Sequence, residues 1–478
     1  MNTGPPTVAV VGGGISGLAG AHRLRHLLGE RARIVLVDRA ARLGGVLHAV
    51  ELAGLPFDMG AEAFLARRPE VPALLAELGL SEHLVHPTSA SATIRAGGHV
   101  VPLPTRTMLG VPGRGAQLTG LLTPAGAAQV AAEAELQMSW RPGADAALGA
   151  LLRERFGDEL TDRLADPLLG GVYASRVDQL GLRATIPALA SALDAGAPSL
   201  TDAAESLLPA PSPRTASPPV FGALRGGYRV LIEALVNSAR PELRLGMPVR
   251  DLTRRPDGWR LEIGAAIAPE ALDVRAVLLA VPAPAARSLL ADVCPGAARE
   301  AGAVDLASSV VVGLAYRESE LSSLPDTSGV LIAADEPMKV KAFTHSARKW
   351  PHLAPGATDG FVRLRASIGR AGDAAMLRAR ADSDLVAWAR ADLAALTGIN
   401  VAPVDAVVQR WGGGLPTYGV GHTELVARLV RAVEDVPGLA IAGAMLHGVG
   451  VPACIGTGRA AAERLVAELG RADGTMAV

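Results

Sequence analysis

The sequence is poor in lysine and aromatic residues, and its charges nearly cancel. Of its 46 basic side chains only three are lysines, Lys339, Lys341 and Lys349. The formal net charge of −1 provides no basic surplus for a polyanion. Aromatic residues make up 3% of the chain, too few for a platform that stacks bases. We therefore expect no nucleic-acid partner.

Cysteine and long apolar runs are also scarce. The two cysteines, Cys294 and Cys454, lie far apart without the spacing of metal ligands, so no metal is expected. No uninterrupted apolar run approaches the ~20 residues that cross a membrane. The first residues lack the pattern of a secretory signal. These absences favour a cytoplasmic protein, attached at most to the inner face of the membrane.

The beginning of the chain alternates strand and helix signals. Thr7 to Val11 is an apolar run with β-branched residues, Leu18 to Leu28 has helical spacing, and Ile34 to Val37 is a second apolar run. Such a βαβ unit opens a doubly wound parallel sheet. With 478 residues and 49% hydrophobic content, the chain can form two or three domains around sizeable cores.

The remaining segments suggest how those domains are arranged. Helical patterns cover Val71 to Leu80, Pro124 to Glu135 and Ala146 to Leu169, and Pro209 to Pro219 has the composition of an exposed linker. Strand patterns follow at Arg244 to Leu252, Trp259 to Ile263, Val274 to Ala280, Ser309 to Tyr316, through Val330 to Phe343, Phe361 to Ile368 and Leu439 to Gly443, before a closing helix from about Arg459 to Leu469. The fold class predicted is α/β: a Rossmann-like nucleotide domain, a mixed-sheet domain and a helical insertion.

A glycine-rich turn joins the first strand to the first helix. Gly12, Gly14 and Gly17 have the GxGxxG spacing, and Gly13, Ile15 and Ser16 complete the turn. The first glycine permits the tight turn, the second lets the backbone approach a pyrophosphate, and the third allows close helix–strand packing. Asp38 ends the second strand, where an acid that binds ribose belongs. This context predicts a dinucleotide site.

Two further glycine-rich segments indicate which dinucleotide is bound. After Asp38 and Arg39 the chain reaches the doublet Gly44 and Gly45, and near its end Gly443 closes a strand while Gly450, Val451 and Pro452 precede a helix. In these features the chain resembles the GG-doublet flavoproteins, the superfamily of amine oxidases and phytoene desaturases. The resemblance implies FAD as the cofactor, with the last helix directed at the flavin ring, where negative charge develops on reduction.

Longer segments narrow the resemblance. FDMGAEAFLARRPE, DPLLGGVYASRVDQLGL, FGALRGGYRVLIEAL, FTHSARKWPH and RWGGGLPTYGVGH occur in this order and resemble the protoporphyrinogen/coproporphyrinogen oxidase family over nearly the whole chain. The LARRPE and HSARKWPH versions are similar to the coproporphyrinogen III oxidases of Gram-positive bacteria, and the arginine-rich composition suits an actinobacterial member. The resemblance implies an FAD domain of residues 1–69, 215–290 and 425–478, a substrate-binding sheet domain of 88–105 and 295–424, and a helical domain of 106–208.

The same resemblance assigns roles to individual residues. The loop Gly60, Ala61, Glu62 and Ala63 approaches the flavin, the backbone of Val249 contacts adenine, and Trp411 is an aromatic near the flavin. Gly171 and Tyr173 border the substrate cavity. The implied reaction is the six-electron oxidation of coproporphyrinogen III to coproporphyrin III in haem synthesis, with molecular oxygen as acceptor and hydrogen peroxide as product. No catalytic acid or base is assigned, and transient contact with the next enzyme of the pathway is left open.

A porphyrinogen is a large apolar macrocycle that carries carboxylates, so its site needs basic groups at the rim. Lys339, Lys341 and His345 lie in one short segment, and if that segment is a strand, the two lysines share a face. Arg67 and Arg68 follow the loop near the flavin and could hold a propionate. We expect these five residues to contact the substrate.

Several alternatives stay open. Protoporphyrinogen IX carries two carboxylates against four in coproporphyrinogen III, and the basic segment favours the latter. An amine oxidase would need paired aromatics at the flavin, and a carotenoid desaturase a more apolar channel. A non-catalytic scaffold that keeps the nucleotide fold would be expected to lose the C-terminal glycine segment, which is intact here.

Overall fold

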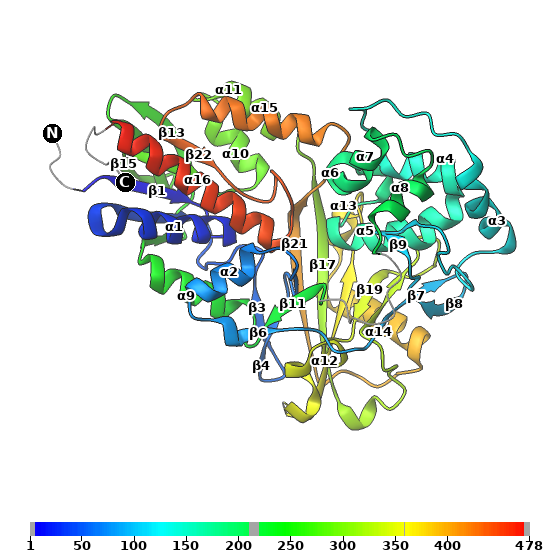
Figure 1. The fold of residues 1–478 in the computed structure, drawn as a ribbon. Helices are drawn as coiled ribbons and strands as arrows, with labels where there is room; N and C mark the ends of the chain where they lie inside the picture. The colour runs from blue at the N-terminus through cyan, green and yellow to red at the C-terminus, as the bar shows by residue number, and fades with distance from the viewer. Residues whose placement is uncertain (1–4, 210–218, 358, 473–478) are drawn as a thin grey trace.

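The computed structural model describes residues 5–209, 219–357 and 359–472, so most of the predicted linker lies outside the described residues. Figure 1 shows a nucleotide-type domain that holds both chain ends, a second sheet, and a group of helices that packs against this sheet. None of the helices in the described ranges has the length and apolarity needed to span a membrane.

The first domain is built on a five-stranded parallel sheet. Its strands lie in the order β12 (Glu242–Leu245), β2 (Arg33–Asp38), β1 (Thr7–Val11), β16 (Ala276–Leu279) and β22 (Leu439–Ile441). This order requires the chain to leave the sheet and return to it twice. β1 has the predicted bounds, and β2 extends the prediction by one residue at each end.

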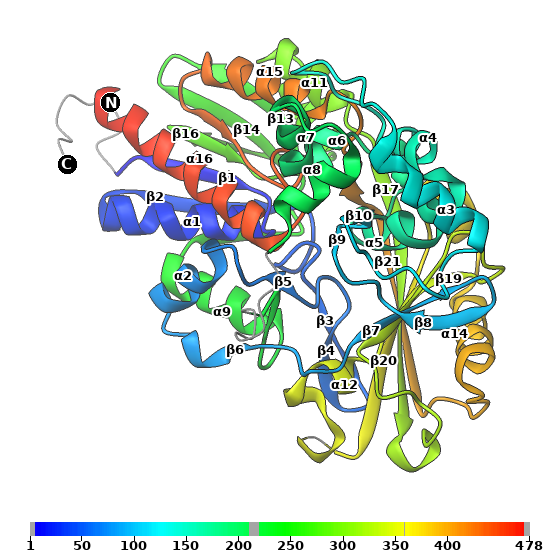
Figure 2. The same ribbon diagram turned by 45° about the vertical axis from the view of Figure 1, so that its right-hand side comes forward.

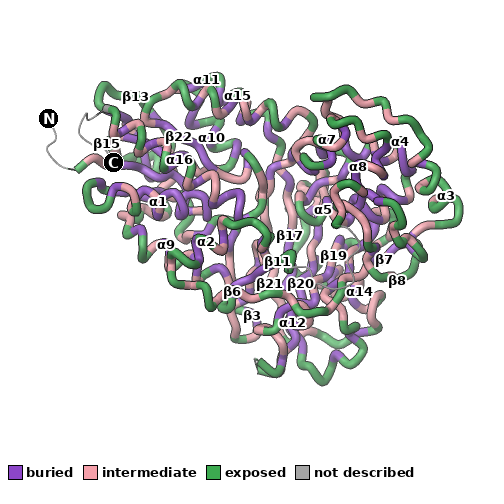
Figure 3. Tube along the Cα trace, viewed as in Figure 1, coloured by how far each residue is buried: buried purple, intermediate pink, exposed green. Residues whose placement is uncertain are grey.

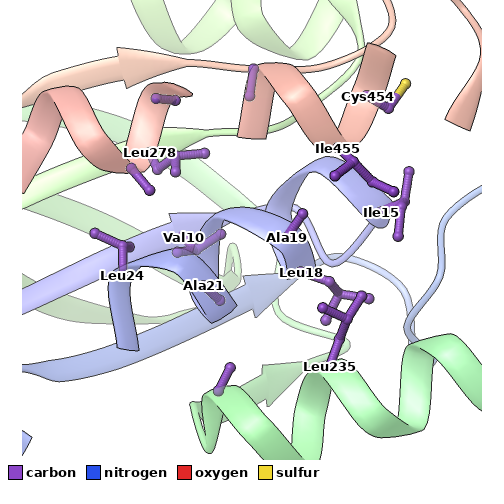
Figure 4. Close-up of a cluster of buried hydrophobic side chains, with 14 of the residues drawn as sticks. Val10, Ile15, Leu18, Ala19, Ala21, Leu24, Leu235, Leu278, Cys454 and Ile455 are labelled. Carbon is purple, nitrogen blue, oxygen red and sulfur yellow. The ribbon is translucent and has the colours of Figure 1, made fainter. Parts of the chain in front are cut away.

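Helices cover one face of this sheet. They are α1 (Ile15–Leu28), α9 (Tyr228–Ala239), α16 (Val451–Ala472) and α2 (Glu70–Glu77), which share one apolar core. Figure 4 shows Leu18 and Ala19 of α1 between Ile455 of α16 and Leu235 of α9. The last helix begins at Val451, eight residues before the predicted start, because the glycine approach ends at Gly450. Val451 and Pro452 therefore form its first turn, and the prediction that they precede the helix is wrong.

A small sheet and three helices pack on the other face of the parallel sheet. This face packs against the small sheet of β13 (Val249–Arg255), β14 (Gly258–Ala265) and β15 (Ala268–Val274), and against α10 (Ala283–Leu290), α11 (Pro295–Gly302) and α15 (His422–Glu434). α11 thus packs in the core of the first domain, although the predicted boundary at residue 295 assigned it to the sheet domain. The apolar residues that α11 presents to α10 and α15 explain this placement.

The second sheet has seven strands in the order β21 (Asp405–Pro416), β17 (Leu306–Arg317), β20 (Phe361–Ile368), β19 (Val340–Thr344), β18 (Gly329–Ile332), β7 (Ala92–Ala96) and β8 (His99–Pro102). β18 and β7 pair in parallel and the other neighbours are antiparallel, so the sheet is mixed as predicted. The helix α14 (Asp382–Thr397) packs on one face. The hairpin of β3 (Ala49–Leu52) and β4 (Leu55–Asp58) packs on the other and joins the sheet to the first domain (Figure 2).

Short strands complete the connection between these parts. β5 (Phe64–Leu65), β11 (Phe221–Leu224) and β6 (Leu84–Val85) form a three-stranded sheet below the parallel sheet, and β9 (Thr107–Met108) pairs with β10 (Val111–Pro112) at the helical domain. Figure 3 shows buried backbone concentrated in the parallel strands and in the centre of the seven-stranded sheet.

The helical domain contains α3 (Pro124–Ala132), α4 (Leu148–Leu160), α5 (Asp166–Tyr173), α6 (Leu182–Thr185), α7 (Pro187–Asp194) and α8 (Leu200–Leu207) around one core. The helical pattern from Ala146 to Leu169 is confirmed as helix from Leu148 onward, but the run is interrupted. Gly157 has φ of +86° inside α4, and a π-helical turn at Thr161–Ala165 separates α4 from α5. Both features change the direction of the chain, and α5 is thereby packed against β18 and β19 of the second sheet.

The prediction of one strand from Arg244 to Leu252 is wrong, because this segment contributes to two strands in two different sheets. Gly246 has φ of +68°, and the run Gly246–Pro248 separates β12 from β13. The amides of Gly246 and Met247 donate to the carbonyl oxygens of Ala40 and Asp38 (2.9 Å each). The break therefore places the start of β13 beside the end of β2.

Candidate cofactor and substrate site

The carboxyl ends of the parallel strands bring the predicted cofactor residues to one edge. Gly12 follows β1 and its amide donates to the Val37 carbonyl oxygen (2.8 Å), while the amide of Ala280, after β16, donates to Val11 (2.8 Å). Gly443 lies two residues beyond β22. Ligands of doubly wound sheets bind at this edge, outside the carboxyl ends of the strands.

The three motif glycines have different surroundings. Gly12 has φ of +107°, and a Cβ there would lie 2.2 Å from the Ala280 oxygen. A Cβ on Gly17 would lie 1.9 Å from the Gly12 oxygen, so this glycine lets α1 pack against the turn. A Cβ on Gly14 would meet nothing nearer than Gly45 Cα at 4.0 Å. The surface at Gly14 is therefore open, in front of the amino end of α1, which favours an anion.

The glycine doublet lies against this turn. The Gly44 amide donates to the Gly13 oxygen (2.8 Å), and Gly14 and Gly44 form an isolated parallel bridge. Gly45 has φ of +59°, and its Cα is the nearest atom to the open side of Gly14. The guanidinium of Arg42, a residue that the sequence analysis did not single out, donates to the Gly45 oxygen (2.9 Å). Two motifs thirty residues apart thus form one loop pair.

Asp38 supports the same turn. One carboxylate oxygen accepts a hydrogen bond from the Gly13 amide (2.6 Å) and the other from the Ala40 amide (2.7 Å). Each oxygen keeps a second lone pair for a ribose hydroxyl. The Met247 amide donates to the backbone oxygen of Asp38, and Val249 begins β13 two residues later, so Val249 lies near this carboxyl edge of the sheet. Arg39, which follows Asp38 in the chain, is exposed.

The loop from Gly60 to Ala63 is held from the seven-stranded sheet. Arg365 of β20 donates to the Gly60 oxygen (2.6 Å), and the Trp411 indole donates to the Met59 oxygen (2.9 Å). A Cβ on Gly60 would lie 1.7 Å from the Val46 oxygen, so only glycine fits this close approach. The sheet domain thereby fixes the loop that was predicted to approach the flavin.

The carboxylate of Glu62 is engaged within the protein. It accepts a hydrogen bond from Ser346 Oγ and pairs with Lys349 Nζ at 3.2 Å. Burial alone would raise the pKa of Glu62, but Lys349, Arg365 and Ser346 outweigh it and lower the pKa to about 2. A contact of Glu62 with a cofactor would therefore come from its backbone, as it would for Ala61 and Ala63.

Tyr418 connects the C-terminal glycine segment to the other domains. Its hydroxyl donates to the Ala444 oxygen and accepts from the Gly448 amide (2.8 Å). Its ring stacks on His422 with centroids 4.0 Å apart, and His422 Nε2 lies 3.3 Å from the Leu446 oxygen. Neither residue was singled out from the sequence, although both lie in the recognised RWGGGLPTYGVGH segment. The segment itself was the available signal.

The carboxyl end of α5 lies beside Tyr418. The Tyr173 ring is 5.6 Å from the Tyr418 ring, and burial raises the pKa of Tyr173. Gly171 is exposed, and a Cβ there would meet no atom within 4 Å. The structure thus brings Gly171 and Tyr173 to the junction with the Gly443–Pro452 segment.

The basic residues are more dispersed than predicted. Lys339 precedes β19, and its ammonium lies 5.9 Å from the Trp388 ring of α14. Lys341 occupies a register irregularity between Val340 and Ala342 and lies near Asp166 of α5. α14 and α5 pack on opposite faces of the sheet, so the prediction that the two lysines share a face is wrong. The cause is the bulge at Lys341, which breaks the alternation of side chains along β19.

The other predicted substrate residues also separate. His345 is 2% exposed and its Nδ1 lies 2.9 Å from the Thr327 oxygen, within the sheet domain. Arg68 pairs with Glu70, whereas Arg67 is exposed on the same turn. The structure therefore does not gather Arg67, Arg68, Lys339, Lys341 and His345 into one cluster.

Two cavities adjoin these groups. One of about 410 Å³ lies at the junction of the three domains, and its polar lining includes Gln179, Ser308, Arg370, Thr417 and His422. The other, of about 620 Å³, lies beside the glycine doublet and the hairpin, with Leu43, His48, Arg229 and Glu233 in its wall. His422 lines the first cavity and its Nε2 lies 3.3 Å from the Leu446 oxygen, so this cavity adjoins the C-terminal glycine segment.

Comparison with known proteins gives a consistent result. Residues 15–466 match the family model described as flavin-containing amine oxidoreductase. The chain is 44% identical to the coproporphyrinogen III oxidase of Mycobacterium leprae over 97% of this chain and 98% of that protein. It is 27% identical to the protoporphyrinogen oxidase of Bos taurus, over 96% and 98% of the two chains.

A solved structure from Exiguobacterium sp. 255-15, whose name includes protoporphyrinogen oxidase, is 29% identical, with a TM-score of 0.83 over 98% of this chain and 100% of that one. The predicted fold class and FAD cofactor are thereby confirmed, and the open glycine turn at the amino end of α1 fits such a dinucleotide. The chain belongs to the flavin-containing amine oxidoreductases, in the group related to the protoporphyrinogen and coproporphyrinogen oxidases.

Proposed function

We propose that the protein oxidises coproporphyrinogen III to coproporphyrin III. The reaction removes six electrons and six hydrogens in three two-electron steps, and three molecules of oxygen become three of hydrogen peroxide. The observation that carries the choice of substrate is the 44% identity to a coproporphyrinogen III oxidase over nearly both whole chains, against 27% to a protoporphyrinogen oxidase.

FAD, when bound, supplies the two-electron acceptor, and the protein positions it. In the proposal the turn of Gly12 to Gly17 and the doublet of Gly44 and Gly45 hold the pyrophosphate, Asp38 and Arg39 lie at the ribose, and the Val249 backbone lies at the adenine. The Gly60–Ala63 loop, Trp411, Gly443, Gly450 and the first two residues of α16, Val451 and Pro452, surround the flavin ring. The amino end of α16 then faces the part of the ring that becomes negative.

The substrate enters beside these groups. Gly171 and Tyr173 border its macrocycle, and Arg67, Arg68 and Lys341 are the basic groups retained for its carboxylates. Lys339 and His345 are left out because the first lies against Trp388 and the second is enclosed in the sheet domain. No side chain is assigned as a general base, so the protons released by the macrocycle pass to solvent.

The test is anaerobic mixing of the holoenzyme with coproporphyrinogen III and, separately, with protoporphyrinogen IX. Flavin absorbance would be followed before air is admitted, and porphyrin fluorescence afterwards. Faster flavin bleaching and faster porphyrin formation with coproporphyrinogen III are expected. Preference for protoporphyrinogen IX would transfer the assignment to that substrate, and no bleaching with either would refute a porphyrinogen oxidase.

A further inference from the structure

Lys341 is buried without a partner of its own. It is 7% exposed, and its ammonium makes no hydrogen bond or ion pair with any residue that the structure describes. Burial, followed by the charge of Arg370, lowers its pKa to about 8. Buried ammonium groups are normally paired, because leaving one unpaired in the interior is costly.

Arg370 is a second cation at the same place. Its Nη2 donates to the Ile332 oxygen (3.3 Å) at the end of β18, and its Nε lies 3.9 Å from one oxygen of Asp166. The backbone amide of Arg370 donates to Asp373 (2.9 Å), but Asp373 forms no ion pair with Lys341 or Arg370 in the described structure.

Asp166 cannot neutralise both cations. It is 1% exposed, and one of its oxygens already accepts from the Val177 amide (2.9 Å) and lies 3.0 Å from Arg176 Nε. Its other oxygen has no hydrogen-bond partner. Arg176, Arg370 and Lys341 therefore share one buried carboxylate, and among the described residues only Arg176 of these three forms an ion pair with a second carboxylate, Asp162 at 3.0 Å.

Arg370 connects this cluster to the cavity of about 410 Å³, whose wall it forms together with Gln179, Ser308 and Thr417. Gln179 closes the short turn that begins at Val177, the residue bonded to Asp166. The cavity also reaches Thr417, which directly precedes Tyr418, and His422, whose Nε2 lies 3.3 Å from the Leu446 oxygen. A molecule in this cavity would therefore contact Arg370 of the positive cluster and residues beside the segment proposed to hold the flavin.

We propose that Lys341 and Arg370 form a binding site for one carboxylate of the substrate. The inference rests on the proposed function and adds Arg370 to its substrate groups. Charge-assisted hydrogen bonds from two partly desolvated cations would bind a carboxylate strongly and orient its side chain. A carboxylate here would also supply the negative charge that the cluster lacks.

The test uses the oxidised holoenzyme and two porphyrins, coproporphyrin III and its uncharged tetramethyl ester, in the same detergent buffer. The dissociation constants would be measured by porphyrin fluorescence for the wild type, Lys341→Met, Arg370→Met and the matched control Lys339→Met. We expect each of the first two substitutions to weaken coproporphyrin III binding roughly 10- to 100-fold. Binding of the ester should change little, and Lys339→Met should resemble the wild type.

Each other outcome has a definite meaning. Unchanged coproporphyrin III affinity in a folded Lys341→Met or Arg370→Met protein would overturn the site. Equal weakening of acid and ester would show that the residue acts through packing, which would also overturn it. Wild-type turnover of coproporphyrinogen III, measured in parallel, separates these results from failure of the proposed function itself.

Discussion

Replacement of Lys341 by methionine should stabilise the substrate-free protein. The lysine is 7% exposed and forms no ion pair within the described residues, and burial lowers its pKa from the ordinary 10.5 to about 8. At 1.36 kcal/mol per pKa unit, this difference means that charging the side chain inside the fold costs about 3 kcal/mol. Methionine fills a similar volume without charge, so the free energy of unfolding at pH 7 should rise by up to about 3 kcal/mol.

The sign of the effect fixes its pH dependence. Between about pH 8 and 10.5 the unfolded wild type keeps a proton on Lys341 that the folded protein has lost, so wild-type stability rises with pH in this window. Below pH 8 both states are protonated and the full cost remains. Arg370 lowers this pKa, whereas Asp166 and Asp373 raise it, and their effects are contained in the value of about 8. The advantage of Lys341→Met should therefore shrink from pH 7.5 to pH 10.

The assay is urea unfolding of both holoproteins at pH 7.5 and pH 10, with Lys339→Met as the control that should not change stability. Saturating coproporphyrin III should stabilise the wild type more than Lys341→Met, because the ligand binds the native wild type more tightly. A variant less stable than the wild type at pH 7.5, or an advantage that does not depend on pH, would refute the reasoning. A less stable variant would mean that Lys341 is paired and structural, whereas an advantage without pH dependence would mean that it does not come from the charge of Lys341.

Three further predictions concern the cofactor site. Gly14→Ala should fold and lose FAD, since its Cβ meets no protein atom closer than 4.0 Å. Gly17→Ala should unfold at lower temperature, because its Cβ would lie 1.9 Å from the Gly12 oxygen. Melting temperature and flavin content would check both variants, and full flavin content in Gly14→Ala would contradict the assignment. Tyr418→Phe removes two hydrogen bonds to the C-terminal segment and should weaken FAD binding roughly tenfold, measured by flavin release on dilution; unchanged release would show that the segment is held otherwise. Glu62→Gln should destabilise the protein at pH 7. This loss of stability should shrink as pH falls from 4.5 toward 2, because the pKa of Glu62 is lowered to about 2. Urea unfolding at pH 7 and pH 3 would measure the loss, and an equal loss at both pH values would contradict the ion pair with Lys349.

Local patterns in the sequence were sufficient to locate the first strand and the turn after it. The strand from Thr7 to Val11 was correct because β-branched residues dominate it, and the turn begins at Gly12, whose φ of +107° favours glycine. Asp38 at the end of the next strand follows from the same short-range pattern.

Features that depend on pairing with other strands were harder to predict from the sequence. Alternation along a strand predicted one face for Lys339 and Lys341, but the extra residue at the bulge becomes visible only when β19 is paired with β20. The break at Gly246 was similarly hidden, because the apolar pattern continues across it from one sheet to the other. Neither error required unusual residues; both arose from partners distant in sequence.

Tyr418 shows why the substrate and cofactor parts are coupled. Its backbone carbonyl accepts from the Gly181 amide of the helical domain, its ring contacts Tyr173, and its hydroxyl holds Ala444 and Gly448. A displacement of α5 would therefore act on the turn before α16 through this one side chain. The sequence marks the tyrosine within a recognised segment, but its role depends on three elements that meet only in the folded protein.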